Sequence, residues 1–323
     1  MCVMKKSPIY VIINPVSGSE SKQNIPEMIA GAFDQRKFDV IIRITGYPEH
    51  ATEIAREAIN NNVGTVITVG GDGTVNEVAR VLVDTDTTLG IIPSGSGNGL
   101  ARELGIPMDT PKAIEIIRDN HTRIIDYGVA NNHIFFTTCG VGFDAFVSEK
   151  FADEKKRGPL GYVRNVLESV IDFKSEDYEI IYDEGSIKER AFIVTCGNAS
   201  QYGNDAFIAP GANLEDGKMN VSILKPLNAL EIPQTTLQLF TKNIDKNSKM
   251  ITLLTSNLVI KRSHPGIMHV DGEPVSTDRE IHVKIVPKGL KVLAPSKMDI
   301  KKKENENIFT ALTRWLADEG SIF

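Results

Sequence analysis

Two segments of this chain have the same order of parts: an apolar run, a glycine-rich turn and the start of a helical pattern. The run Val63 to Val69 leads into Gly70-Gly-Asp-Gly-Thr-Val-Asn-Glu77. The run Thr87 to Ile92 leads into Pro93-Ser-Gly-Ser-Gly-Asn98, and a helical pattern follows over 99–104. Glycines are expected to take conformations closed to other residues and to bring backbone N–H groups against an anion, and Thr74 is expected to cap the following helix. Two such units in succession predict a phosphate site rather than a lone tight turn.

The first part of the chain alternates between strand-like and helical patterns. The predicted strands cover 8–13, 38–44, 63–69 and 87–92, and the predicted helices cover about 22–33, 49–61 and 74–84. Such alternation favours a three-layer α/β domain with a mostly parallel sheet covered by helices. Ligands of open parallel sheets bind beyond the carboxyl ends of the strands. The segment Asn14 to Gly18, Thr45 and both glycine turns are expected there.

After Asp126 the pattern changes to short strands, which predicts an antiparallel second domain, an all-β sandwich. The predicted strands cover 124–130, 133–138, 177–182, 190–197, 218–224, 250–254, 257–262, 266–270, 280–286 and 290–293, with helical patterns near 144–151, 160–172 and 227–242. We expect a nucleotide-binding domain over 1–126, a substrate domain over 127–296 and a C-terminal amphipathic tail over 297–323.

Composition narrows the class of protein. The chain has 323 residues, enough for about two domains, and a net charge of −6, which argues against general nucleic-acid binding. The three cysteines, Cys2, Cys139 and Cys196, have no metal-ligand spacing and suit a reducing cytoplasm. No stretch reaches the roughly 20 apolar residues of a membrane span. We therefore expect a cytoplasmic protein that is soluble or attached only to a membrane surface.

Two familiar nucleotide motifs are absent from the sequence. There is no Gly-x-x-x-x-Gly-Lys-Ser/Thr motif, and the glycines at 95, 97 and 99 lack the third glycine of a dinucleotide fingerprint. A hydride-transfer enzyme is therefore disfavoured.

Seven motifs in order carry a family resemblance. They are Asn14-Pro-x-Ser-Gly18, Thr45 with His50-Ala51, Gly70-Gly-Asp-Gly-Thr74, Pro93-Ser-Gly-Ser-Gly-Asn98, Gly142-Phe-Asp-Ala145, Asp216-Gly217 and Asp271-Gly-Glu273. In this order they resemble the bacterial soluble diacylglycerol kinase and sphingosine kinase family over residues 8 to about 294. The resemblance implies an NAD kinase-like and diacylglycerol kinase-like fold, with ATP between the domains and transfer of its γ-phosphate to a lipid hydroxyl.

The resemblance also implies which residues bind the nucleotide. By motif match these are Asn14, Pro15, Ser17, Gly18, Thr45, Gly70, Gly71, Gly73, Thr74, Asn76, Glu77, Ser94, Gly95, Ser96, Gly97 and Asn98. Glu77 follows Thr74 by one helical turn, so it is expected on the ribose or adenine side. The alternative for Glu77 is a solvated helix carboxylate.

Three carboxylates are candidates for the chemistry, which requires positioning, Mg²⁺ and a group that receives the hydroxyl proton. Asp72 is the candidate to organise Mg²⁺, since a cation relieves the repulsion between a carboxylate and phosphates. The family implies a water-mediated metal link for Asp126, whose alternative is a helix-capping or turn aspartate. The family also implies that Glu273 is the general base. In its alternative reading, Glu273 is a polar residue after an Asp271-Gly272 hairpin turn.

The segment Pro210 to Met219 resembles the family's structural Mg²⁺ site. Asp216 would supply a side-chain oxygen, and backbone carbonyls near Asn213 and Lys218 would complete the site. The alternative is a plain β-turn, which can itself bind an ion.

The acceptor and the membrane contact are less defined by sequence. Diacylglycerol kinases carry an acid after the asparagine of the second loop, whereas this chain has Gly99. Diacylglycerol, a sphingoid base, ceramide and other lipid alcohols therefore all stay open. The basic runs at 155–157 and 301–303, and an apolar face formed by Ile308, Phe309, Leu312, Trp315 and Leu316, are candidates for peripheral contact with the inner face of the membrane. Solvated surface is the alternative for the basic runs. The apolar face is also compatible with packing on the protein or in a homodimer.

Two other functions compete with a lipid kinase. NAD kinases share Gly-Gly-Asp-Gly and the two-domain plan, although that family follows this turn with its own Asn-Glu motif and a different serine/threonine-glycine loop. A regulator that binds nucleotide or lipid without catalysis is the other alternative, and the presence of Asp72, Asp126 and Glu273 weighs against it.

Overall fold

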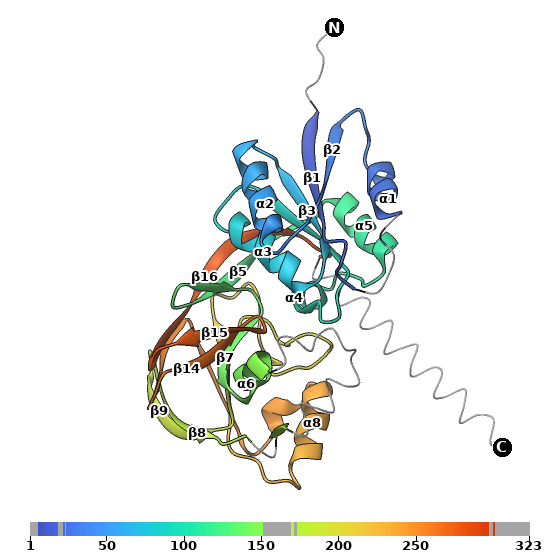
Figure 1. The fold of residues 1–323 in the computed structure, drawn as a ribbon. Coiled ribbons are helices and arrows are strands. Elements are labelled where there is room, and N and C mark those ends of the chain that lie inside the picture. Colours follow the sequence, from blue (N-terminus) through green and yellow to red (C-terminus); the bar gives the residue numbers. More distant parts are fainter. Residues whose placement is uncertain are drawn as a thin grey trace, which may run out of the picture.

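A computed structural model gives the fold of residues 6–18, 22, 24–150, 169–170, 173–296 and 300 (Figure 1). The first domain contains, in chain order, β1 (Ser7–Ile13), α1 (Ile25–Ala32), β2 (Phe38–Ile44), α2 (His50–Asn60), β3 (Thr65–Gly70), α3 (Asp72–Leu82), β4 (Thr88–Pro93), α4 (Gly99–Glu103), α5 (Thr110–Asp119) and β5 (Thr122–Ala130). The rest of the described chain contains β6 (His133–Phe135), β7 (Thr138–Gly142), α6 (Phe143–Lys150), β8 (Glu176–Tyr182), β9 (Gly185–Ala191), β10 (Ile193–Gly197), β11 (Met219–Leu224), α8 (Ile232–Phe240), a short 3₁₀ helix (Ile244–Lys246), β12 (Met250–Thr255), β13 (Asn257–Arg262), β14 (Gly266–Val270), β15 (Glu273–Thr277) and β16 (Glu280–Leu293).

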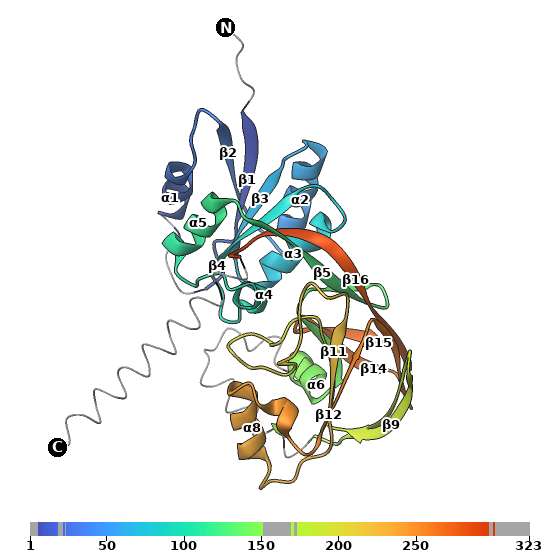
Figure 2. The same cartoon turned by 180° about the vertical axis from the view of Figure 1, so that it is seen from behind.

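The first domain has three layers, as the alternating pattern predicts. Strands β2, β1, β3 and β4 pair in parallel in that order. Helices α2 and α3 cover one face, and α1 and α5 cover the other (Figures 1 and 2). Val66, Ile67 and Val69 of β3 are fully buried, because a central parallel strand is covered on both sides and therefore reads as a continuous apolar run.

Strand β16 joins the two domains into one ten-stranded sheet, which the sequence reading did not predict. Its first half pairs with β13 in the second domain, and near its end Val292 pairs in parallel with Leu89 of β4. The predicted strands 280–286 and 290–293 are thus a single strand, whose register against β5 shifts between Val286 and Leu290. The end of β16 belongs to the core of the first domain, and the predicted division at residue 126 falls inside β5.

The second domain is an antiparallel sandwich, as expected. A six-stranded sheet in the order β12-β11-β10-β7-β14-β15 packs against β8, β13 and the first half of β16. Val141, Val221 and Met268 of one sheet and Ile260 and Val283 of the other form the buried core between them.

Some predicted strand boundaries are wrong. The predicted strand 133–138 is split into β6 and β7, and the predicted strand 190–197 is split into β9 and β10. Strand β15 was not predicted, because Glu273 and Pro274 lack the apolar character of a strand start and are exposed.

The helices of the described chain are mostly shorter than their patterns. The predicted helix 227–242 is reduced to α8, which starts next to a proline at its first turn. The predicted helix near 160–172 lies outside the described residues except for 169 and 170, and the predicted tail over 297–323 lies outside them except for 300. Both basic runs also lie outside the described residues. Among the described residues no helix is both long enough and apolar enough to cross a membrane.

Candidate active site

The two glycine turns meet at the carboxyl edge of the parallel sheet, after β3 and β4. A Cβ atom added to Gly95 would lie 2.5 Å from the Cα atom of Gly71 and 2.9 Å from Asn98 Oδ1. A Cβ atom added to Gly70 would lie 2.7 Å from the Thr74 side chain. Glycine is therefore required here for close approach of two backbone segments.

The structure corrects two expectations for the first glycine turn, which covers residues 70–77. Gly70, Gly71 and Gly73 do not have positive φ angles, so they are not needed for a special backbone conformation. Helix α3 begins at Asp72, two residues before Thr74, so Thr74 is not its cap. The N-terminal amides of α3 have no capping side chain among the described residues, and Gly73 is exposed with open space around its Cα atom. These amides are suited to an anion.

Asp72 links the two turns through its carboxylate. Its Oδ2 accepts a hydrogen bond from the Asn98 N–H (2.8 Å), and its Oδ1 accepts one from the Gly99 N–H (2.7 Å). These are the amides at the start of α4, where a carboxylate is favoured. The carboxylate retains further lone pairs, since two oxygens offer about four acceptor sites.

The loop after β1 completes this edge. The Asn14 side chain donates to Thr74 Oγ1 (3.0 Å) and accepts from the Val16 N–H (3.1 Å). Gly18 has φ +67°, and a Cβ atom there would lie 2.8 Å from the Ser94 carbonyl oxygen. The structure therefore brings the predicted residues of the first loop onto both glycine turns.

Lys22 is a functional candidate that the motif reading missed. Its ammonium donates to the Ser17 carbonyl and to Ser17 Oγ (2.9 Å), and burial lowers its pKa. A lysine eight residues after Asn14 carries no sequence signal for this position. A cation beside the Ser17 loop adds positive charge to a site for phosphate.

Thr45 lies at the same edge of the sheet, whereas the Glu77 carboxylate accepts a hydrogen bond from the protein backbone. Thr45 is buried, and its N–H donates to the Ile13 carbonyl (2.9 Å). Glu77 Oε2 accepts from the Ala51 N–H (3.1 Å) in the first turn of α2, and burial raises the pKa of Glu77. Glu77 is thus neither a solvated helix carboxylate nor free of protein contacts, and its contact with a nucleotide stays a prediction.

Asp271 and Gly272 form a two-residue hairpin turn that places Glu273 at the first position of β15. Both turn residues have positive φ angles, 50° and 81°, as a type I′ turn requires. The Asp271 carboxylate accepts hydrogen bonds from the N–H groups of Phe136, Thr137 and Thr138 at 2.8 to 3.1 Å. Burial raises the pKa of Asp271, and these bonds oppose the shift. The predicted hairpin turn is confirmed. Its hydrogen bonds to residues 136–138 fix the position of the backbone before Glu273.

The Glu273 carboxylate faces the first domain. Its Oε2 pairs with the Arg80 guanidinium at 3.2 Å, and the Glu273 side chain is 49% exposed. Arg80 belongs to the last turn of α3, the helix that starts at Asp72. The sequence gives no signal for Arg80, because its partner lies 193 residues away. One helix therefore connects the glycine turns with the predicted base.

Asp126 is fully buried at the domain junction. Its Oδ2 accepts from the Gly217 N–H (2.7 Å) and its Oδ1 from the Lys288 N–H (2.8 Å). It therefore anchors the 214–217 turn and the irregular part of β16, as its turn-aspartate alternative suggests. Its catalytic role stays a prediction.

The predicted metal loop is a turn on the surface of the second domain. Asp216 is exposed, and its Oδ1 accepts from the Lys218 N–H (3.0 Å). Asn213 Oδ1 accepts from the Glu215 N–H (3.3 Å). Within the described part of the chain, no three His, Cys, Asp or Glu side chains gather closely enough to hold a metal ion.

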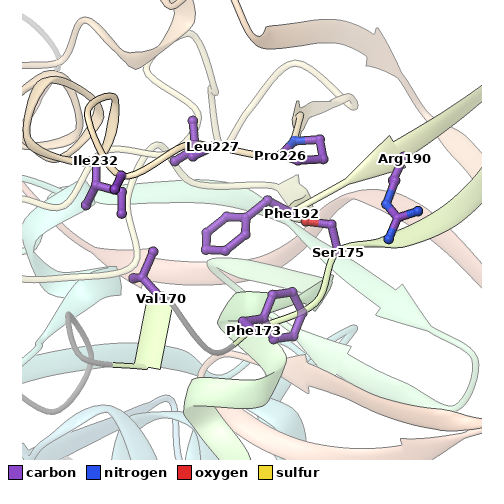
Figure 3. A pocket seen from close by; sticks show the side chains of 9 residues that line it. Val170, Phe173, Ser175, Arg190, Phe192, Pro226, Leu227 and Ile232 are labelled. Atoms are coloured by element: carbon purple, nitrogen blue, oxygen red, sulfur yellow. The ribbon is translucent and has the colours of Figure 1, made fainter.

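A separate cavity of about 280 Å³ lies in the second domain between β9, β10 and the start of α8 (Figure 3). Seven of its nine lining residues have apolar side chains, and Arg190 and Ser175 are the polar members. The apolar lining consists of Val170, Phe173, Phe192, Pro226, Leu227, Ala229 and Ile232. None of the predicted site residues lines it.

Two family models match the two domains of this chain. Residues 8–130 match the diacylglycerol kinase catalytic domain, and residues 137–294 match the YegS C-terminal NAD kinase beta sandwich-like domain. A diacylglycerol kinase from Bacillus subtilis is 32% identical over 86% of this chain and 96% of its own length. One from Mycobacterium tuberculosis is 28% identical over 89% of this chain and 95% of its own length.

Solved structures show the same fold. The crystal structure of a diacylglycerol kinase from Bacillus anthracis superposes with a TM-score of 0.70 at 21% identity, over 90% of this chain and 98% of that one. An NAD kinase from Archaeoglobus fulgidus, solved in complex with ATP, superposes with a TM-score of 0.52 at 12% identity, over 90% and 94%. The sequence matches and the shared two-domain fold together show that this chain belongs to the diacylglycerol kinase family and has the fold of a kinase.

Proposed function

We propose that this protein is an ATP- and Mg²⁺-dependent lipid kinase that transfers the γ-phosphate of ATP to a lipid hydroxyl. One observation carries the proposal: the two glycine turns joined by Asp72 lie at the start of α3, and Glu273 of the other domain pairs with the end of the same helix. The expected phosphate site and a carboxylate of the other domain thus lie at the two ends of one helix. This arrangement suits transfer between a nucleotide and an acceptor held between the domains.

The nucleotide phosphates would lie against the loops of the carboxyl edge. The amides at the start of α3, the exposed Gly73 and Ser96, and the Asn14 to Gly18 loop face this position. Lys22 adds a positive charge. The ATP complex of the NAD kinase with the same fold supports this choice of ligand.

Glu273 would act as the general base. In the proposed step the acceptor oxygen forms a bond to the γ-phosphorus, the bond from that phosphorus to the β,γ-bridging oxygen breaks, and ADP leaves. The hydroxyl proton passes to the Glu273 carboxylate. Its 49% exposure leaves the carboxylate open to an acceptor in addition to Arg80.

Mg²⁺ fits some of the predicted residues better than others. Asp72 retains free lone pairs beside the expected phosphates, and Asp216 is exposed with one oxygen engaged. Asp126 has no exposed surface and both oxygens engaged, so it does not fit a direct ligand. When bound, Mg²⁺ would supply charge neutralisation at the phosphates. Near Asp216, with carbonyls of Asn213 and Lys218, it would stabilise the loop.

The acceptor is proposed from the relatives and from the cavity. The relatives are named diacylglycerol kinases, which makes diacylglycerol the first acceptor to test, and Gly99 keeps sphingoid and ceramide-like acceptors in the test. The cavity beside α8, which seven apolar side chains line together with Arg190 and Ser175, is proposed to take part of the acceptor's hydrocarbon chain. A lipid acceptor implies peripheral contact with the inner face of the membrane from the cytoplasm, and a homodimer fits the proposal without being required.

The test measures transfer of labelled phosphate from ATP, with Mg²⁺, to mixed micelles that carry diacylglycerol, sphingosine, ceramide or monoacylglycerol. NAD is included as a soluble acceptor because an NAD kinase shares the fold. A labelled lipid supports the proposal and names the acceptor. Label on NAD alone replaces it with an NAD kinase, and ATP binding without transfer to any acceptor favours a non-catalytic regulator.

A further inference from the structure

Arg80 and Glu273 form an ion pair between the two domains. Arg80 lies on α3 of the first domain, and Glu273 starts β15 of the second (Figure 1). The guanidinium nitrogen and Glu273 Oε2 are 3.2 Å apart, and the two side chains are 30% and 49% exposed. A pair with this exposure contributes little to stability, so its role is sought in the orientation of the two side chains.

Glu273 is the one hydrogen-bond acceptor of Arg80 within the described residues. The Arg80 Nε atom is buried and has no partner there. A guanidinium carries five donors in a planar fork, and this one uses a single nitrogen toward a single carboxylate oxygen. The orientation of Arg80 therefore serves Glu273 rather than a wider network.

The backbone of Glu273 is fixed, whereas its side chain needs a partner. The Asp271 carboxylate fastens the hairpin turn to three consecutive amides of 136–138. Glu273 itself has rotatable bonds and a half-exposed side chain, and Arg80 is its one ion-pair partner among the described residues. A base that rotates freely spends little time within reach of a hydroxyl proton.

Helix α3 gives the pair a defined place relative to the glycine turns. Arg80 follows Asp72 by eight residues, about 12 Å along the helix axis. Helical side chains lean toward the helix N-terminus, so the guanidinium reaches back toward the turn that starts at Asp72. The pair thus holds the Glu273 carboxylate beside α3, the helix that begins at the first glycine turn.

We propose that Arg80 is a positioning residue that orients the Glu273 carboxylate for proton abstraction from the acceptor. The proposal rests on the proposed kinase function and on Glu273 as its base. Arg80 contacts neither acceptor nor nucleotide in this proposal, and acts through Glu273 alone.

The test compares Arg80→Ala, Arg80→Lys, Glu273→Gln and the double variant Arg80→Ala with Glu273→Gln, using ATP and the acceptor that the wild type accepts. Arg80→Ala is expected to lower kcat by about 10- to 100-fold, since a small misplacement of a catalytic group has this effect. The KM for ATP is expected to stay unchanged. Arg80→Lys keeps the charge and is expected to retain more activity than Arg80→Ala.

The double variant separates positioning from a structural role. If Arg80 acts through Glu273, Arg80→Ala should not lower the rate of phosphate transfer further in a protein that already carries Glu273→Gln. This rate is measured by single turnover with excess enzyme. The control is Asp86→Asn, which removes the Lys291–Asp86 ion pair. Asp86 precedes β4, whereas the second glycine turn follows that strand. This substitution is expected to leave kcat unchanged.

Three results would overturn the inference while the proposed function stands. In each of them the wild type is active. The first is a kcat of Arg80→Ala equal to that of the wild type, and the second is a kcat above it. The third is an equal fold-loss of the transfer rate on Arg80→Ala whether position 273 is Glu or Gln. An inactive wild type with every acceptor overturns the proposed function itself. Melting temperatures of all variants show whether a loss reflects unfolding, and Arg80→Lys supplies the readout if Arg80→Ala does not fold.

Discussion

Gly71 and Gly95 meet backbone to backbone, although they lie on turns that follow different strands. A Cβ atom on Gly95 would be 2.5 Å from the Cα atom of Gly71, and one on Gly71 would be 3.2 Å from the Cα atom of Gly95. This contact holds the two turns together, and the Asp72 carboxylate reinforces it with two hydrogen bonds. The geometry of the candidate phosphate site therefore depends on both glycines.

Gly95→Ala should separate the two turns. We expect a loss of stability of about 1–3 kcal/mol, typical of overpacking, and weaker ATP binding. Thermal unfolding and calorimetric titration with ATP measure the two effects. Gly73→Ala is the stability control, since no atom lies within 4 Å of an added Cβ there and alanine favours a helix. A melting temperature for Gly95→Ala equal to wild type would contradict the contact.

Asp72→Ala should impair both the fold of the second turn and nucleotide binding. Removal of the carboxylate leaves the amides of Asn98 and Gly99 without their acceptor, at a cost on the order of 1–3 kcal/mol for each amide left unpaired. We expect a lower melting temperature, weaker binding of Mg²⁺ with ATP, and loss of turnover. Asp72→Asn, which keeps one oxygen acceptor, should be more stable than Asp72→Ala. Equal stability of the two variants would argue against the described hydrogen bonds.

Glu273→Gln should abolish transfer with little effect on folding or on ATP affinity. General acid–base catalysis contributes about 10²–10⁴ in rate, so a loss of this size is expected in kcat. The amide keeps the shape of the side chain and can still accept from Arg80. Turnover close to wild type would show that another group receives the proton.

Glu77 should make folding stability depend on pH. Burial raises its pKa in the folded protein above the ordinary value of 4.5, so folding favours the protonated carboxyl. This contribution to stability is fully present below pH 4.5 and is lost as pH rises through the higher folded value. Melting temperatures of wild type and Glu77→Gln from pH 4 to pH 7 test the effect. The variant should gain stability relative to wild type as pH rises, and parallel curves would contradict the prediction.

The two domains should unfold together. Strand β16 pairs with β13 in the second domain and with β4 and β5 in the first, and Leu290, Val292 and Leu293 belong to the core of the first domain. Differential scanning calorimetry should show one cooperative transition, with equal calorimetric and van't Hoff enthalpies. A chain that ends before residue 288 should fail to form a stable first domain. Two resolved transitions would show that the shared strand does not couple the domains.

The local parts of the fold follow from local patterns. The buried run of β3, the alternation of strands and helices before Asp126, and the glycine turns are readable because apolar periodicity and turn residues act over a few positions. The Asp271-Gly272 hairpin is readable for the same reason. Strand β15 is not, since its exposed edge carries Glu273 and Pro274 instead of apolar residues.

Contacts between residues that are far apart in the chain could not be predicted from the sequence. The continuity of β16 was hidden because its irregular segment around Lys288, with φ +56°, looks like a loop between two strands. Asp126 looked like a catalytic residue or a turn residue, and only the folded chain brought Gly217 and Lys288 to its two oxygens. Glu77 likewise found its partner on another helix.

The α/β and β-sandwich classes, the two glycine turns and the family motifs can be predicted from the amino-acid sequence, because short-range patterns encode secondary structure and backbone turns. Three contacts arise only when the chain packs in three dimensions: Gly71 touches Gly95, the Asp72 carboxylate joins the two turns, and Arg80 pairs with Glu273 across the domains. These contacts join residues that are 24 to 193 positions apart, and their geometry is set by how strands and helices pack, which no local pattern records.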